Sequence, residues 1–356
     1  MNRIVRLCTV LLAATLAATG CATHEAKFER DVPPRPVDRV AQERTALRAA
    51  AHLIEHFRPE MNALPADALA PLTKSAALLF EVTGAPGMRR ATRIFADTLL
   101  QTRASVGSGQ AFYSSIRPGR PSEEATVDAG DALVDAFIAT GNERYRAAVT
   151  DATRAVTSRS LGWTKVRNGF AVRVASYGAR YYSVSRTAAA AAFLFRAAAI
   201  DANPQVRPAA ARALRLVSAS QAAAGRWYET FGARSPMTLA SWARTLLALG
   251  SSGRSPLRDI ENAGALVLWT AAFRGDGTPL NTPLVDRRGF GLAIALSLLQ
   301  EAGGTKSYAD LAYRYALDHR RDDGTVETAA AGDDVVQAYF TLAFAQRAYR
   351  LRTNAH

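Results

Sequence analysis

A repeat of about fifty residues constrains the fold of this chain more than any other feature of its sequence. Each unit begins with an apolar helix that ends near a glycine, as at Gly84, Gly141, Gly250 and Gly303. A short turn, a second amphipathic helix and a longer connection rich in polar and aromatic residues complete the unit. Such a unit cannot bury its apolar helix by itself, so the repeats must pack against one another.

The first helices of the units are predicted over residues 72–83, 128–140, 187–200, 238–249, 289–302 and 334–350. The second helices are predicted over residues 87–103, 144–158, 206–221, 256–272 and 307–319. The last first-type helix has no successor, but an amphipathic helix over residues 40–57 precedes the first unit. If that leading helix packs beside the last one, the repeat closes into a ring and leaves no exposed end.

The first helices are nearly apolar all round, as in the run 188–195, whereas the second helices keep a charged face. A helix that is apolar on every side is a buried one. We therefore expect an all-α domain over residues 40–356, with the first helices as an inner ring and the second as an outer ring. No strand alternation competes with this interpretation.

This organisation resembles the (α/α)6 toroid, or six-hairpin architecture, of many glycoside hydrolases, polysaccharide lyases, uronate epimerases and terpenoid-cyclase-like proteins. The turns after the outer helices are similar to theirs, namely 221–227, Asp276-Gly277-Thr278 and Asp323-Gly324-Thr325. The resemblance implies a cleft where the inner helices begin. It implies no particular reaction, because one fold hosts many chemistries.

The N-terminus is typical of an exported protein. Residues 1–20 combine Arg3 and Arg6 with an apolar stretch, and the sequence leading to Gly20-Cys21 resembles a bacterial lipobox. The resemblance implies acylation of Cys21 and anchoring at the periplasmic face of the outer membrane, with residues 21–39 as a tether. A plain signal peptide, with Cys21 incidental, is the alternative. Because the other cysteine, Cys8, lies within residues 1–20, we expect neither a disulfide nor a cysteine metal site.

The long connections should meet at the start of the inner helices, and they carry the candidate binding residues. Aromatic faces beside hydrogen-bonding groups suit a sugar cleft. We predict substrate binding by side chains from these connections and the helix starts that follow them, namely Asp131, Trp163, Arg180, Tyr181, Trp227, Tyr228 and Asp334. Packing between repeats is the alternative for Trp227. Trp242 and Trp269 lie inside predicted helices and are expected in the core.

Cleavage of a glycosidic bond by hydrolysis needs two carboxyl groups, one on each side of the bond. The candidates are Glu124, Asp128, Asp131, Glu229, Asp286, Asp333 and Asp334. Asp128 and Asp131 share a helix face, although acids near a helix start also act as caps. Glu229 lies in a loop and is the preferred acid, with Asp128 and Asp286 as further catalytic candidates.

Elimination from a uronate needs a base and a cation, and Tyr181 or Tyr182 with Arg180 fits that requirement, with Tyr182 as the catalytic candidate. The net charge of +13 favours an acidic polysaccharide as substrate, although surface arginines also arise from genome composition or contact with anionic membrane. Nucleic-acid binding is not indicated, because the arginines are scattered. We expect a monomer without cofactor or metal. The function is predicted to be carbohydrate processing by hydrolysis, elimination or epimerisation. The alternative is a non-catalytic scaffold that binds glycan or protein partners in envelope polysaccharide assembly or export.

Overall fold

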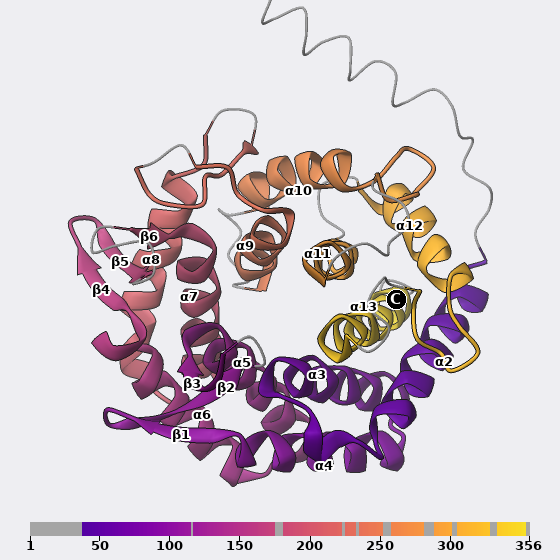
Figure 1. Cartoon of the computed structure of the whole chain (residues 1–356), viewed down its shortest axis with the longest axis horizontal. Coiled ribbons are helices and arrows are strands. Elements are labelled where there is room, and N and C mark those ends of the chain that lie inside the picture. Colours follow the sequence, from indigo (N-terminus) through magenta and orange to yellow (C-terminus); the bar gives the residue numbers. More distant parts are fainter. Residues whose placement is uncertain are drawn as a thin grey trace, which may run out of the picture. The chain divides into compact units, whose positions relative to one another are not determined.

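The computed structural model describes residues 38–114, 117–174, 181–222, 225–232, 235–251, 258–280, 288–300, 305–327 and 333–353. The chain divides into two units, Met1–Val37 and Asp38–His356, and every described residue belongs to the second. Within the described residues, twelve α-helices form two concentric rings (Figure 1). The all-α toroid predicted from the repeat is the fold of this unit.

The inner ring contains one helix from each repeat, and these helices are α3 (Ala66–Thr83), α5 (Glu123–Thr140), α7 (Val184–Ala199), α9 (Leu239–Ser251), α11 (Arg288–Leu298) and α13 (Asp334–Thr353). The outer ring consists of α2 (Arg39–Phe57), α4 (Pro86–Gln101), α6 (Glu143–Val156), α8 (Arg207–Ala219), α10 (Arg258–Ala272) and α12 (Lys306–Asp318). Short 3-10 helices lie at Met61–Ala63, Arg159–Leu161 and Pro204–Val206.

The ring closes as the unpaired leading helix predicts. The last inner helix, α13, packs against both α2 and α3 (Figure 1). Arg347 of α13 donates a hydrogen bond to Gln42 of α2 at 3.2 Å, which joins residues at opposite ends of the sequence. The leading helix α2 therefore supplies the outer partner that α13 lacks in the repeat.

Three of the predicted inner helices begin at least three residues earlier than the sequence suggested, and one of them is α7, which starts at Val184 in place of residue 187. Helix α3 starts at Ala66 and not at residue 72, and it continues through Pro71. Helix α5 starts at Glu123, because the Ser122 side chain caps it by accepting a hydrogen bond from the Ala125 N–H. Asp128 and Asp131 thus lie beyond the first turn of α5, so they do not cap that helix.

The helix-ending glycines are confirmed at two of the four positions. Gly84 and Gly141 adopt φ of 65° and 68°, and each N–H donates to the carbonyl four residues earlier at 2.7 Å. Gly250 instead lies inside α9, where its missing side chain leaves room for Glu261 of α10. Gly303 lies outside the described residues.

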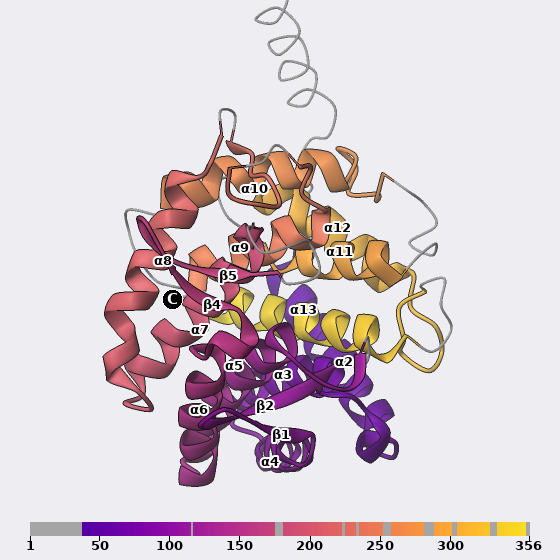
Figure 2. The ribbon, with the colours of Figure 1, turned by 60° about the vertical axis from the view of Figure 1, so that its left-hand side comes forward.

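The sequence prediction contained no strands, but two connections fold into small antiparallel sheets. The first sheet contains β1 (Arg103–Val106), β2 (Gly109–Ser114) and β3 (Arg117–Ser122), and the second contains β4 (Trp163–Val166), β5 (Gly169–Arg173) and β6 (Tyr182–Ser183). The strands lie over the part of the ring formed by α5 to α8 (Figure 2). Each sheet leads directly into an inner helix.

The two sheets are structural repeats, although their sequences differ. The Phe112 N–H in β2 donates to the Thr126 hydroxyl at 3.1 Å, and the Val172 N–H in β5 donates to the Thr187 hydroxyl at 2.9 Å. Each threonine lies four residues after the serine that caps its helix, Ser122 or Ser183. These short strands escaped the sequence analysis because their sheets are stabilised by contacts with helices.

The later repeats use tight turns in place of sheets. In Asp276-Gly277-Thr278 and Asp323-Gly324-Thr325, the aspartate accepts a hydrogen bond from the threonine N–H at 2.9 Å. Gly277 and Gly324 have φ of 84° and 87°, and a Cβ on Gly277 would lie 2.5 Å from Leu311 of α12. A Cβ on Gly324 would lie 2.7 Å from His52 of α2, so α2 occupies the place of the next outer helix.

Trp242 and Trp269 are buried in the core, as predicted, with 8% and 2% of their surfaces exposed. Among the described helices, none combines the length and the apolar character that crossing a lipid bilayer requires.

Candidate functional site

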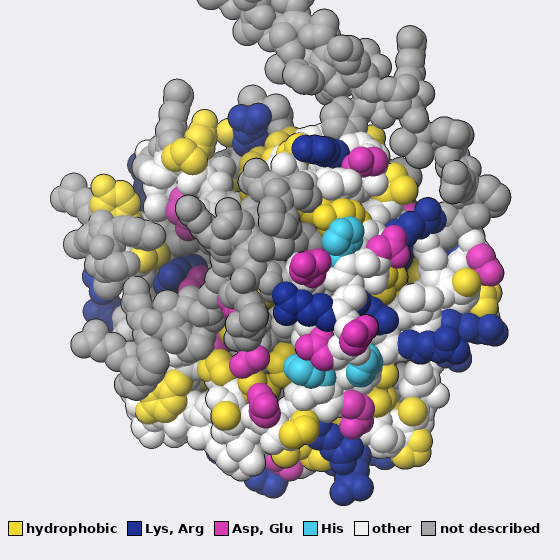
Figure 3. Space-filling view, turned by 45° about the vertical axis from the view of Figure 1, so that its right-hand side comes forward, with side chains coloured by type: hydrophobic (Ala, Val, Ile, Leu, Met, Phe, Trp, Pro, Cys, Tyr) yellow, Lys and Arg dark blue, Asp and Glu magenta, His cyan; other side chains and the backbone are white. Residues whose placement is uncertain are grey.

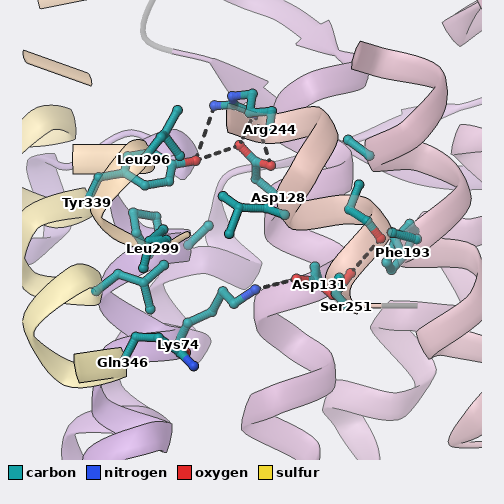
Figure 4. Close-up of a pocket in the computed structure, with 18 of the residues that line it drawn as sticks. Lys74, Asp128, Asp131, Phe193, Arg244, Ser251, Leu296, Leu299, Tyr339 and Gln346 are labelled. Carbon is teal, nitrogen blue, oxygen red and sulfur yellow. Dashed lines mark hydrogen bonds and ion pairs between the residues drawn. The ribbon is translucent and has the colours of Figure 1, made fainter. Parts of the chain in front are cut away.

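A cavity of about 420 Å³ lies inside the ring and is lined mainly by the inner helices (Figure 4). Its lining follows the repeat. Counted from the first residue of each inner helix, the sixth, ninth and thirteenth positions face the cavity, which is the i, i+3, i+7 spacing of one helix face. The exception is the sixth residue of α11, Ala293, which is not among the lining residues. Helices with unrelated sequences therefore contribute equivalent positions to three successive layers.

The layer of sixth residues contains a tie across the ring. Its lining residues are Pro71, Asp128, Ala189, Arg244 and Tyr339. Arg244 of α9 donates to Asp128 of α5 at 2.9 Å, and the Tyr339 hydroxyl of α13 donates to the same carboxylate at 2.9 Å (Figure 4). Arg244 also donates to the Tyr339 oxygen at 3.2 Å. This cross-ring tie connects three alternate inner helices.

The contacts within the cross-ring tie determine the charge of Arg244 and of Tyr339. Burial alone would lower the pKa of Arg244, but the neighbouring Asp128 carboxylate reverses this effect and raises it. Burial and Asp128 together raise the pKa of the Tyr339 phenol well above its ordinary value. Arg244 therefore remains a cation and Tyr339 a neutral hydrogen-bond donor.

The layer of ninth residues differs sharply between the two halves of the ring. Its members are Lys74, Asp131, Ala192, Leu247, Leu296 and Leu342. The charged residues come from α3 and α5, whereas α9, α11 and α13 each contribute a leucine. We refer to Leu247, Leu296, Leu299 and Leu342 as the leucine wall.

The layer of thirteenth residues extends this difference toward the other end of the ring. Its members are Leu78, Asp135, Arg196, Ser251 and Gln346, together with Gln300, which lies two residues after the end of α11. Arg196 donates to Asp131 and Asp135 through its two terminal nitrogens, and Lys74 donates to Asp131 and lies 3.8 Å from Asp135. We refer to Lys74, Asp131, Asp135 and Arg196 as the charged wall; Figure 4 shows Lys74 reaching toward Asp131.

The charged wall is internally compensated. Burial alone would raise the pKa of Asp131, but Arg196 and Lys74 overcome this effect and lower it. Burial alone would lower the pKa of Arg196, which the two aspartates instead raise. Two cations and two carboxylates thus form a neutral set whose side chains are about 20–25% exposed.

A second cluster lies where the inner helices begin, which we call the N-terminal rim. Arg186 of α7 pairs with Glu124 of α5 at 3.3 Å. The Ser183 hydroxyl, which caps α7, donates to Glu229 at 3.2 Å, while the Val184 N–H donates to the Glu229 backbone carbonyl at 3.0 Å. The loop that carries Glu229 is thereby held against the start of α7.

Burial raises the pKa of two carboxyl groups of the rim. Burial raises the pKa of Glu229, against the hydrogen bond from Ser183, which lowers it. Burial also raises the pKa of Glu123 to about 8, with Arg186 opposing the shift and Glu124 adding to it. Glu123 is 6% exposed, and among the described residues neither of its carboxyl oxygens has a hydrogen-bond partner.

The structure brings several predicted site residues together. Asp128 and Asp131 line the cavity from one face of α5, as their spacing predicted. Glu229 and Tyr182 lie near each other at the rim, where the Phe231 N–H donates to the Tyr182 carbonyl at 3.1 Å. Tyr228 is half-buried, and Tyr181 is 45% exposed.

Other predicted residues lie elsewhere. Trp163 is 5% exposed and stacks on Phe170, and Trp227 is 2% exposed with its indole N–H donating to the Val217 carbonyl at 3.0 Å. The expectation that these two tryptophans form a sugar platform is wrong, because both rings are enclosed by protein. Asp334 begins α13 and is not among the residues lining the cavity; burial and Glu60 raise its pKa. Asp286, Arg180 and Cys21 lie outside the described residues.

The sequence analysis missed Lys74, Asp135, Arg196, Arg244 and Tyr339, all of which line the cavity. These side chains fall into equivalent layers only when the inner helices are aligned by their true first residues, and the sequence analysis placed the starts of α3, α5 and α7 three to six residues too late. Among the described residues, no three His, Cys, Asp or Glu side chains are grouped so as to hold a metal ion. On the face shown in Figure 3, basic and acidic side chains are interspersed.

No protein-family model matches the chain, and none of the curated proteins is significantly similar to it in sequence. Solved structures do match the fold. A glycosyl hydrolase of family 88 from Bacteroides vulgatus is 12% identical with a TM-score of 0.58, over 86% of this chain and 99% of that chain. An unsaturated glucuronyl hydrolase specific for heparin is 10% identical with a TM-score of 0.63, over 88% and 98%.

A third similar structure is an α-1,6-mannanase, GH76A, of Salegentibacter sp. HEL1_6, in a form inactivated at two aspartates and bound to α-1,6-mannotetrose. It is 12% identical with a TM-score of 0.63, over 85% of this chain and 98% of that chain. These likenesses place the described unit in the six-hairpin glycosidase-like fold, as the repeat predicted.

Proposed function

We propose that this chain cleaves a glycosidic bond of a carbohydrate at the N-terminal rim of its ring. The observation that carries the proposal is the grouping of Glu123, Glu124 and Glu229 around Arg186, about one helical turn from Asp128 and Ala189, which line the cavity. Hydrolysis needs one protonated and one ionised carboxyl group, and environments that differ between neighbouring carboxyls supply that pair. The similar structures include enzymes that act on carbohydrates, which supports the same class.

We assign the proton donor to Glu229 and the carboxylate to Glu124. Glu229 is half-buried, and burial raises its pKa above the ordinary value, so it combines access with a shift in the direction that a proton donor needs. Glu124 is 40% exposed and faces the Arg186 guanidinium, which stabilises its charge. The Asp128 carboxylate accepts hydrogen bonds from Arg244 and Tyr339. We propose that it holds the inner helices in place and takes no part in proton transfer.

The experiment uses the full chain purified in detergent, incubated with neutral and uronate-containing oligosaccharides. New reducing ends indicate hydrolysis, and unsaturated products that absorb ultraviolet light indicate elimination. Loss of a carboxyl group that transfers a proton or stabilises charge lowers turnover by about 10² or more, so Glu229→Gln and Glu124→Gln should each do so. Glu143→Gln, an exposed residue of α6, is the matched control and should leave turnover unchanged.

Unaltered turnover in Glu229→Gln would contradict the assignment. Saturable binding with no product from any glycan would contradict cleavage and support the non-catalytic scaffold. An acidic substrate is supported by the basic balance of the chain. In the described lining of the cavity, however, the four cations Lys74, Arg196, Arg244 and Arg350 face four acids, so the lining adds nothing to that support.

We further propose that the protein is a monomeric lipoprotein of the outer membrane, acylated at Cys21 and facing the periplasm. The support is the sequence of residues 1–21, with its basic start, apolar stretch and Gly20-Cys21 ending. Mass spectrometry of the membrane-extracted chain should show an acylated N-terminal Cys21, and Cys21→Ser should release the protein from the membrane. Light scattering of the Cys21→Ser protein should give the mass of one chain.

A further inference from the structure

The interior of the ring, below the cross-ring tie, presents two unlike walls to one partly open cavity. The charged wall comes from α3, α5 and α7, and the leucine wall comes from α9, α11 and α13. Figure 1 shows that α3, α5 and α7 follow one another around one half of the inner ring, and α9, α11 and α13 around the other half. A ligand in this space therefore contacts charged groups on one side and hydrocarbon on the other.

We propose that this cavity binds a neutral sugar residue, with its hydroxyls on the charged wall and a C–H face on the leucine wall. The proposal deepens the proposed function in that it takes the ligand to be a carbohydrate. It does not require that any bond be cleaved.

The charged wall suits hydroxyl groups because donors and acceptors alternate along it. Arg196 lies between Asp131 and Asp135, and Lys74 lies beside both acids. A sugar hydroxyl can donate to a carboxylate and accept from a neighbouring cation at the same time. A ligand carboxylate in the same place would face two aspartates, whose repulsion cancels the attraction of the two cations.

The leucine wall suits the less polar face of a sugar ring. Leu296, Leu299 and Leu342 are each exposed by 6% or less, so they form a packed surface. Hydrocarbon contact removes C–H surface from water without demanding hydrogen bonds. Beyond the leucines, Ser251, Gln300 and Gln346 supply hydroxyl and amide groups without net charge.

The size of the cavity limits what it can hold. Small-molecule sites occupy roughly 300–1,000 Å³, and about 420 Å³ lies near the lower end of that range. The space accommodates a short saccharide and cannot enclose the interior of a long chain. The site therefore suits the end of a glycan, or a released mono- or disaccharide.

The test compares matched ligands by titration calorimetry on the full chain in detergent. The probes are the methyl glycosides of glucose, mannose and galactose and those of the corresponding uronic acids, which differ only in a carboxylate. At least one neutral glycoside should bind about tenfold more tightly than its uronic partner, the effect of one uncompensated charge contact. Equal or tighter binding of the uronic acids, or no binding of any probe, would overturn the proposal.

Variants then locate the bound sugar. Asp135→Asn leaves the charged wall with one excess cation, so it should shift the ratio of neutral to uronic affinity about tenfold toward the uronic acid. Ser251→Ala changes no charge and should weaken both probes several-fold, which provides a second test if Asp135→Asn does not fold. An unchanged ratio in a folded Asp135→Asn protein, or unchanged affinities in Ser251→Ala, would place the sugar elsewhere.

Glu229→Gln separates this proposal from the proposed function. That variant removes the assigned proton donor at the rim and leaves both walls intact, so it should bind the neutral glycoside with wild-type affinity. Binding without any turnover would contradict cleavage and leave the sugar site standing. If the wild-type protein cleaved a glycan but bound the neutral and uronic probes equally well, the sugar site would be contradicted and the proposed cleavage would stand.

Discussion

The two halves of the inner ring use equivalent positions for different purposes. At the ninth residue of their helices, α3 and α5 place Lys74 and Asp131, whereas α9, α11 and α13 place Leu247, Leu296 and Leu342. One half is held together by ion pairs, and the other by apolar packing. The contrast shows that the repeat fixes where side chains point, while the residue at each position decides which chemistry faces the cavity.

The largest effect should follow from breaking the charged wall. Arg196→Met leaves Asp131 and Asp135 with Lys74 alone, and loss of one partner from a buried ion-pair cluster costs about 4 kcal/mol of unfolding free energy. Urea unfolding at pH 7 measures this loss. A loss below 1 kcal/mol would show that the ion pairs do not hold this half together.

The same variant should show a characteristic pH dependence. The folded-state pKa of Asp131 is depressed below its ordinary 3.8, so its stabilising contribution is present above that value and disappears as the pH falls through the folded-state pKa. The stability difference between wild type and Arg196→Met should therefore shrink as the pH is lowered from 5 toward 3. A constant difference would contradict this account of the charged wall.

Breaking the leucine wall should cost slightly less and should not depend on pH. Leu296 is 1% exposed, and truncation of a buried leucine to alanine costs about 3 kcal/mol. Leu296→Ala should lower the free energy of unfolding by that amount at pH 7 and at pH 4 alike. A pH-dependent loss would mean that the leucine wall is coupled to the titrating groups opposite.

Glu123 lies at the N-terminal rim as the first residue of α5, and it extends the comparison of the two halves to a buried carboxyl group. Because its folded-state pKa is raised to about 8 from 4.5, the unfolded chain releases this proton first, and folding stability falls as the pH rises between these values. Glu123→Gln removes the ionisation and should stabilise the protein by about 2 kcal/mol at pH 7. The gain should vanish below pH 4.5; a gain that persists there would point to altered packing.

The smallest effect is expected on the outer ring. Asp151 of α6 pairs with Arg154 at the surface, at 3.1 Å, with the arginine side chain 52% exposed. Exposed pairs contribute about 0.5 kcal/mol or less, so Asp151→Asn should leave the urea midpoint nearly unchanged. A large loss would mean that surface ion pairs, and not the inner walls, dominate stability.

Much of the fold follows from local signals in the sequence. Gly84 and Gly141 end their helices as glycine chemistry predicts, and the unpaired leading helix identifies the partner of α13. The β-sheets do not follow from local signals, because β2 and β5 depend on hydroxyl groups of Thr126 and Thr187 and on the outer helices they cover. The start of α3 was predicted six residues late, at residue 72 in place of Ala66, and the helix continues through Pro71.

The candidate site was only partly predictable. Spacing alone places Asp128 and Asp131 on one helix face, and Glu229 lies at the rim where its loop was expected. Residues that act through partners in other repeats, such as Arg196 and Arg244, have no local signature. Trp227 has a clear local signature that misleads. An aromatic residue after a turn looks the same in the sequence whether its side chain faces a ligand or, as here, the core.

The most direct measurement is a crystal structure of the protein, determined from crystals soaked with the neutral glycoside that binds most tightly. The account predicts electron density for one sugar ring inside the toroid, with hydroxyls in contact with Asp135 or Arg196 and its carbon face against Leu296. Density confined to the outer surface, or an interior that stays free of sugar at saturating concentration, would contradict it.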